Sequence, residues 1–96
     1  MKNGRFRVNG RALIGYDSLT EAERGALDRA LLPLVNLPEA RWTAVGAIRL
    51  ELKEPLYVVR VDDSLRALVR PADGGRPELV DLVRQEFLQR YFRSVG

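Results

Sequence analysis

The stretch of residues 56–71, LYVVRVDDSLRALVRP, constrains the fold more than any other part of the chain. Two runs of apolar, strand-forming residues flank the acidic segment 62–64, a pattern typical of a β-hairpin with a polar turn. Each run also carries an arginine, Arg60 before the turn and Arg66 after it. Because neighbouring residues of a strand face opposite sides of a sheet, the register of the hairpin decides where both arginines point.

Two turn lengths give two different registers. A two-residue turn over 63–64 places Arg66 among apolar side chains. A three-residue turn over 62–64 pairs Arg60 with Arg66 and sorts the side chains into two distinct faces, so we expect this second register. Its apolar face consists of Tyr57, Val59, Val61, Leu65, Ala67 and Val69. Its other face consists of Leu56, Val58, Arg60, Arg66, Leu68 and Arg70.

The expected register sets two positive charges directly opposite each other. Such a pair destabilises a sheet, so we expect an anion between Arg60 and Arg66. One candidate is an internal carboxylate, from Asp62, Asp63 or Asp81, that bridges both guanidinium groups. The other is a phosphate or an acidic segment of a partner, which the planar fork of arginine is suited to bind. The spacing of the residues leaves both candidates open.

A helix is predicted ahead of the hairpin, over residues 18–32. Its start contains the Ser/Thr-x-x-Glu capping box twice, once from Ser18 and once from Thr20. Apolar residues then recur at helical spacing and predict one buried stripe. They are Ala26, Leu27, Ala30, Leu31, Leu34 and Val35. Pro33 lacks the backbone N–H that a helix interior uses, so we expect the helix to end near Leu32 or to kink there.

The remaining segments complete an α+β pattern. Residues 5–16 predict a bent strand or a hairpin around the Asn-Gly pair, and residues 48–52 alternate like a strand. A Gly-Pro-rich turn over 71–77 leads to a strand over 78–83 and a C-terminal helix over 84–95. The apolar stripe of that helix, expected to be a docking surface, is Phe87, Leu88, Tyr91, Phe92 and Val95. We therefore expect an N-terminal strand and helix packed on a three- to four-stranded antiparallel meander with a short C-terminal helix, forming a single domain over 1–96.

Composition limits the chemistry that the chain can perform. With 96 residues the chain can form one hydrophobic core but not two. It contains no cysteine and no histidine, which excludes disulfides, thiolate nucleophiles and the commonest metal ligand and general base. We expect neither a metal nor a cofactor. No apolar stretch approaches the length of about 18 residues that a membrane span needs, so we expect a cytoplasmic protein that does not enter a membrane.

The charge distribution is uneven although the net charge is only +3. Lys2, Arg5, Arg7 and Arg11 all precede the first acidic residue, Asp17, and the C-terminal region is also rich in arginine. A basic segment of this kind is common as a solubility feature and is also found in arms that bind nucleic acids.

A longer pattern runs from the hairpin to the end of the last predicted strand. It comprises a Leu-Tyr-x-x-Arg-Val strand, an arginine early in the next strand, and a Val-Asp-x-x-Arg strand end. The residues are Leu56, Tyr57, Arg60, Val61, Arg66, Val80, Asp81 and Arg84. With the helix ahead of it, this pattern resembles the RelE/ParE superfamily, the bacterial toxins of type II toxin–antitoxin pairs. The resemblance covers roughly residues 18–92.

The resemblance implies a compact RelE/ParE-like toxin with a basic sheet face. Ribonucleolytic members hold messenger RNA on this face in the decoding site of the ribosome, where a 2′-hydroxyl attacks the adjacent phosphate. By position, Arg60 and Arg66 would hold the phosphate, Arg84 would be the arginine that follows the last strand, and Tyr91 would be nearest to the tyrosine that some of these nucleases carry. The implied partners are a cognate antitoxin protein and RNA at the ribosome.

Two departures from the family pattern leave the activity open. Val58 stands where the best-studied nucleases have a lysine, and the histidine of other branches is absent. The chain could therefore be an endoribonuclease that relies on arginines, or a ParE-like inhibitor of DNA gyrase without nuclease activity. A third possibility, from a different class, is a degenerate, non-toxic protein-interaction module.

Overall fold

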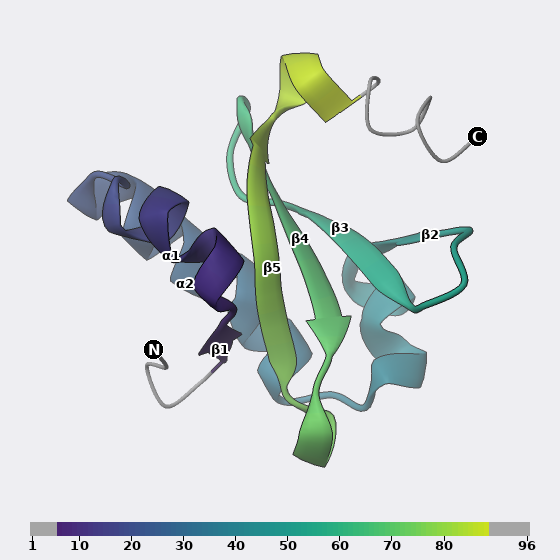
Figure 1. Ribbon diagram of the computed structural model, residues 1–96. Helices are drawn as coiled ribbons and strands as arrows, with labels where there is room; N and C mark the ends of the chain where they lie inside the picture. Colours follow the sequence, from purple (N-terminus) through teal and green to yellow (C-terminus); the bar gives the residue numbers. More distant parts are fainter. Residues whose placement is uncertain (1–5, 89–96) are drawn as a thin grey trace.

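The computed structural model describes residues 6–88 and has the expected α+β class (Figure 1). Two α-helices and a 3-10 helix precede a meander of four strands, and a short first strand joins the same sheet. The elements are β1 (Arg7–Val8), α1 (Gly10–Asp17), α2 (Glu21–Val35), η1 (Glu39–Val45), β2 (Ile48–Leu50), β3 (Leu56–Arg60), β4 (Leu65–Pro71), η2 (Asp73–Gly75) and β5 (Pro77–Arg84). Residues 85–88 are helical and begin the predicted C-terminal helix.

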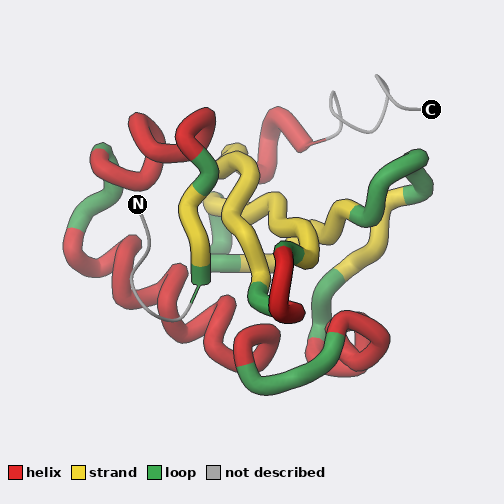
Figure 2. Tube along the Cα trace, turned by 60° about the horizontal axis from the view of Figure 1, so that its bottom comes forward, coloured by secondary structure: helices red, strands yellow, loops and turns green. Residues whose placement is uncertain are grey.

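The sheet has the strand order β1-β5-β4-β3-β2. Strands β2 to β5 are antiparallel to their neighbours, as predicted, whereas β1 lies parallel to β5 at one edge. Both views place α1 and α2 along one side of the sheet (Figures 1 and 2). The side that they cover is called the helix face below, and the opposite side the second face.

The register of the hairpin confirms the three-residue turn. Tyr57 pairs with Val69, Val59 with Ala67, and Arg60 with Arg66. The side chains then separate into two buried clusters, one on each face of the sheet. The cluster on the helix face includes Phe6, Leu27, Leu31, Leu34, Trp42, Tyr57, Val59, Ala67, Val69 and Leu79. The cluster on the second face comprises Leu50, Leu56, Val58, Leu68 and Leu88.

The N-terminal region differs from the prediction of a bent strand or hairpin. The strand ends at Val8, and α1 begins at Gly10 with Asn9 as its N-cap. The Asn9 side chain accepts a hydrogen bond from the backbone N–H of Arg11 at 2.9 Å. An asparagine before a glycine is typical of both tight turns and helix starts. Here it starts a helix, in which Ala12 is buried against the core.

Helix α2 confirms the second of the two predicted capping boxes. The backbone N–H of Glu23 donates to Thr20 Oγ1 at 3.1 Å, and the Thr20 N–H donates to Glu23 Oε1 at 3.0 Å. The expected end near Leu32 is wrong, because the helix continues through Pro33 to Val35. Pro33 is exposed, and Leu34 beside it is fully buried, so packing outweighs the one backbone hydrogen bond that proline removes.

The helix η1 was not expected. It carries Trp42, which is fully buried and lies edge-on against Tyr57 with ring centroids 5.1 Å apart. The indole N–H donates to the carbonyls of Leu34 and Leu37, both at 3.1 Å. The Tyr57 hydroxyl donates to Glu39 at 2.8 Å, and burial together with this bond raises the pKa of Tyr57.

The C-terminal helix is described only as far as Leu88, which is buried on the second face as its apolar stripe predicts. Phe87 departs from that expectation, because it is 48% exposed. The other residues of the stripe, Tyr91, Phe92 and Val95, lie outside the described residues.

Candidate functional site

The turn of the β3–β4 hairpin is held by one aspartate. Asp62 Oδ1 accepts hydrogen bonds from the backbone N–H groups of Ser64 and Leu65, both at 2.8 Å, and from the Ser64 hydroxyl at 3.2 Å. The hydrogen bond from the Ser64 backbone is the main reason that the pKa of Asp62 is lowered. This carboxylate is therefore part of the turn and fixes where the two neighbouring arginines leave the sheet.

Arg60 and Arg66 lie directly opposite each other on the second face, at the end of the hairpin. Arg60 forms an ion pair with Asp63, whose side chain is 96% exposed, while that of Arg60 is 65% exposed. Arg66 is half-buried, and its Nη1 donates to the carbonyls of Asp62 and Leu65. The two guanidinium groups thus have different acceptors although they share one end of the sheet.

The structure shows an internal anion for one arginine of the pair but none that is shared by both among the described residues. Asp63, one of the three internal candidates, is an ion-pair partner of Arg60. Within residues 6–88 no carboxylate bridges both guanidinium groups. Asp81, the third candidate, accepts the backbone N–H of Leu82 at 2.8 Å. An anion that joins Arg60 to Arg66 must therefore come from outside this part of the chain.

Apolar side chains surround the arginine pair on the second face. Arg66 pairs with Val83 on β5, and the next hairpin pair on this face is Val58 with Leu68. Val58 is 3% exposed and Leu68 is fully buried, so the cations stand at the rim of an apolar cluster. A low-dielectric neighbour strengthens the attraction between a guanidinium group and an anion.

Arg84, the third predicted site residue, does not lie beside Arg60 and Arg66. It pairs with Leu65 and faces the helices. Its Nη2 donates to Glu23 Oε2 at 3.2 Å and its Nη1 to Ser64 Oγ at 3.3 Å. Arg84 therefore connects β5, the hairpin turn and α2, and it lies on the other side of the sheet from Arg60 and Arg66.

A β-bulge explains the position of Arg84. Val69 pairs with Leu79 but Leu68 pairs with Asp81, so Val80 is an extra residue in β5. If β5 had no extra residue, the alternation of its side chains would place Arg84 on the same face as Arg66. The bulge moves Arg84 to the opposite face. The sequence contained a signal for this, because apolar residues at 79, 80, 82 and 83 break the period of two. Tyr91, the fourth predicted residue, lies outside the described residues.

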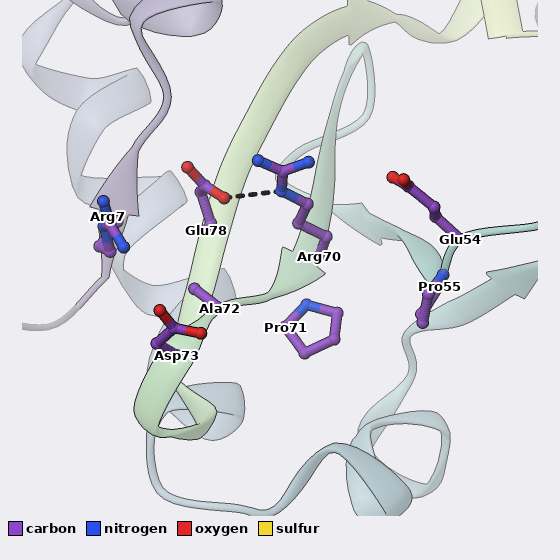
Figure 3. Close-up of a pocket in the computed structure, with 8 residues that line it drawn as sticks. All are labelled: Arg7, Glu54, Pro55, Arg70, Pro71, Ala72, Asp73 and Glu78. Atoms are coloured by element: carbon purple, nitrogen blue, oxygen red, sulfur yellow. Dashed lines mark hydrogen bonds and ion pairs between the residues drawn. The ribbon is translucent and has the colours of Figure 1, made fainter.

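A second candidate is a cavity of about 390 Å³ at the other end of the β4–β5 hairpin (Figure 3). It is lined by Arg7, Glu54, Pro55, Arg70, Pro71, Ala72, Asp73 and Glu78. Sequence reasoning missed it because its residues come from three separate segments. The register places Glu78 between Arg7 on β1 and Arg70 on β4.

The charged groups of this cavity compensate one another. Arg70 Nε donates to Glu78 Oε1 at 2.7 Å, and Asn9 Nδ2 donates to Glu78 Oε2 at 3.3 Å. The Glu78 side chain is only 10% exposed, and the bond from Arg70 is the main reason that its pKa is lowered. Two arginines thus face three carboxylates, and the central pair is already formed. We interpret the cavity as a structural connection of β1 to the meander rather than as a binding site.

Comparisons with known proteins add no further identification: no family model, no curated protein and no solved structure matches the chain. Over residues 6–88, no helix has the length and apolar character required to cross a membrane.

Proposed function

We propose that the chain is a toxin of a type II toxin–antitoxin pair that binds RNA at the ribosome through Arg60 and Arg66. The observation that supports this proposal most directly is the pairing of these two residues across the hairpin. It sets two arginines directly opposite each other beside a buried apolar cluster, with no described carboxylate shared between them. Guanidinium groups bind phosphate oxygens through paired, charge-assisted hydrogen bonds.

The arrangement favours binding over cleavage. Attack by a 2′-hydroxyl requires a group that accepts a proton and a group that donates one beside the phosphate. The carboxylates next to the arginine pair are Asp62, which is bonded to the turn, and Asp63, which is ion-paired. Arg84, the arginine that follows the last strand, faces the helices and is not available beside the pair. We therefore propose RNA binding that blocks translation as the main activity of the toxin, neutralised by a cognate antitoxin.

The position of Arg84 also favours a second candidate from the same superfamily. A ParE-like inhibitor of DNA gyrase needs no nuclease residues, so a sheet face without a general base is compatible with it. A non-toxic interaction module would bind neither RNA nor gyrase.

Induction of the chain in bacteria tests these alternatives. We expect growth arrest by the wild type, loss of arrest by Arg66→Ala, and full arrest by Arg41→Ala, an exposed arginine in η1 that serves as a matched control. Equal arrest by all three proteins would contradict the role of the arginine pair. Primer extension on messenger RNA then reports cleavage at codon boundaries if the toxin is a nuclease, whereas induction of the DNA-damage response indicates gyrase. A non-toxic module would give no arrest.

A further inference from the structure

The two aspartates of the turn, although adjacent in sequence, are held in different ways. Asp62 is fixed by three hydrogen bonds within the turn. Asp63 makes an ion pair with Arg60, and 96% of its side chain is exposed to solvent. The turn therefore depends on Asp62 for its shape, and Asp63 can move away from Arg60 without disturbing the hairpin.

The ion pair between Arg60 and Asp63 is exposed, and exposed pairs have a small interaction free energy. Both side chains are largely in water, where the Coulomb attraction is screened and two flexible side chains lose freedom on pairing. A phosphodiester carries the same charge as a carboxylate and could contact the guanidinium groups of both Arg60 and Arg66, which pair across the strands. A bound phosphodiester would thus contact both arginines, whereas Asp63 pairs only with Arg60.

We infer that Asp63 occupies the phosphate position on Arg60 and must be displaced when a phosphodiester of RNA binds between Arg60 and Arg66. This inference rests on the proposed function and adds a residue that sets its affinity. Asp63 is a competing carboxylate built into the turn. It lowers the affinity for any single phosphate and leaves the binding of a longer strand, with additional contacts, less affected.

The experiment compares Asp63→Asn with Asp73→Asn. Both changes remove one negative charge from an exposed aspartate, but Asp63 precedes β4 and Asp73 follows it, at the opposite end of the strand. Binding of a fluorescent single-stranded RNA oligonucleotide is measured by anisotropy at low salt. We expect Asp63→Asn to bind about twofold to fivefold more tightly than the wild type, as loss of one exposed competing ion pair implies. Asp73→Asn should bind like the wild type.

Two further measurements separate specific competition by Asp63 for Arg60 from a general effect of charge. In an Arg60→Ala background, Asp63→Asn should give no gain, because its partner is gone. The gain should also shrink at high salt, which screens the exposed pair. Equal gains from Asp63→Asn and Asp73→Asn, or a gain that persists without Arg60, would overturn the inference.

The same assay distinguishes failure of the inference from failure of the proposed function. If Arg60→Ala and Arg66→Ala bind the oligonucleotide as tightly as Arg41→Ala, the arginine pair is not the RNA site and both proposals fail. If the two variants lose affinity while Asp63→Asn equals the wild type, RNA binding stands and only the competing role of Asp63 is refuted. Because the Asp63 side chain is 96% exposed, its replacement should leave the fold intact, which thermal unfolding of the variant verifies.

Discussion

Arg60, Arg66 and Arg84 are the same residue type in one sheet, yet their guanidinium groups have different partners. Arg60 meets an exposed carboxylate, Arg66 meets backbone carbonyls, and Arg84 meets Glu23 of α2. Because all three residues are arginines, each is able to bind an anion, but the residue type alone does not determine which one it meets. The register, and in β5 a single extra residue, decide on which face of the sheet each arginine lies.

The different position of Arg84 gives a prediction about a single residue. Arg84→Ala should leave RNA binding unchanged, whereas Arg66→Ala should weaken it and reduce its salt dependence by about one phosphate contact. The Arg84–Glu23 pair is partly exposed, so its loss should lower the free energy of unfolding only slightly. RNA titrations at several salt concentrations and urea denaturation measure the two effects. A loss of RNA affinity on Arg84→Ala that matches the loss on Arg66→Ala would restore the role that the family resemblance implied.

At the scale of the element, the start of α2 shows how a local signal becomes a tertiary contact. Glu23 closes the capping box with Thr20 and at the same time accepts the hydrogen bond from Arg84. Thr20→Ala should destabilise the protein by about 0.5–2 kcal/mol, because the backbone N–H of Glu23 loses its acceptor, Thr20 Oγ1. Urea denaturation of Thr20→Ala, with Ser18→Ala as the control, tests this. Ser18 is the alternative cap that the structure does not use, so an equal cost for both variants would contradict the assignment of the helix start.

Elements that depend on local patterns were predictable from the sequence. The β3–β4 register follows from the spacing of Arg60 and Arg66 around the acidic turn, and the capping box at Thr20 marks the start of α2. The sequence left two capping boxes open because Ser18 fits the motif equally well. It also misjudged Pro33, since proline lowers helix propensity locally while the burial of Leu34 acts through tertiary packing.

The parts of the site that could not be predicted depend on contacts between distant segments. The bulge at Val80 depends on the pairing of β5 with β4, and alternation within β5 alone would place Arg84 on the face of Arg66. The row of Arg7, Glu78 and Arg70 requires β1 to lie parallel to β5, a pairing of residues about 70 positions apart. The Asn9-Gly10 pair predicted a bent strand or a hairpin, whereas the structure has a helix start there, with Ala12 in the core cluster and Leu13 and Tyr16 packed against it.

At the scale of the whole molecule, the acidic residues with lowered pKa values predict how stability depends on pH. Glu78, Asp62 and Glu23 each have a pKa below the ordinary value, because each accepts hydrogen bonds as a carboxylate. A carboxyl group whose pKa is lower in the folded state contributes its full stabilisation above its unfolded pKa. That contribution is lost as the pH falls through the folded pKa. We therefore expect the free energy of unfolding to be constant near neutral pH and to fall below about pH 4.5.

Glu78 should account for a large share of this dependence, because its side chain is nearly buried and connects β1 to β4 and β5 through Asn9 and Arg70. Glu78→Gln should lower the free energy of unfolding by about 1–3 kcal/mol at pH 7, since Arg70 loses its charged acceptor. The variant should also lose less stability on acidification than the wild type, because the titrating group is gone. Urea denaturation at a series of pH values between 7 and 3 measures both effects, with Glu54→Gln, an exposed acid of the same cavity, as the control. Parallel pH profiles for the wild type and Glu78→Gln would show that the Arg7–Glu78–Arg70 row does not couple protonation to the folding of the whole molecule.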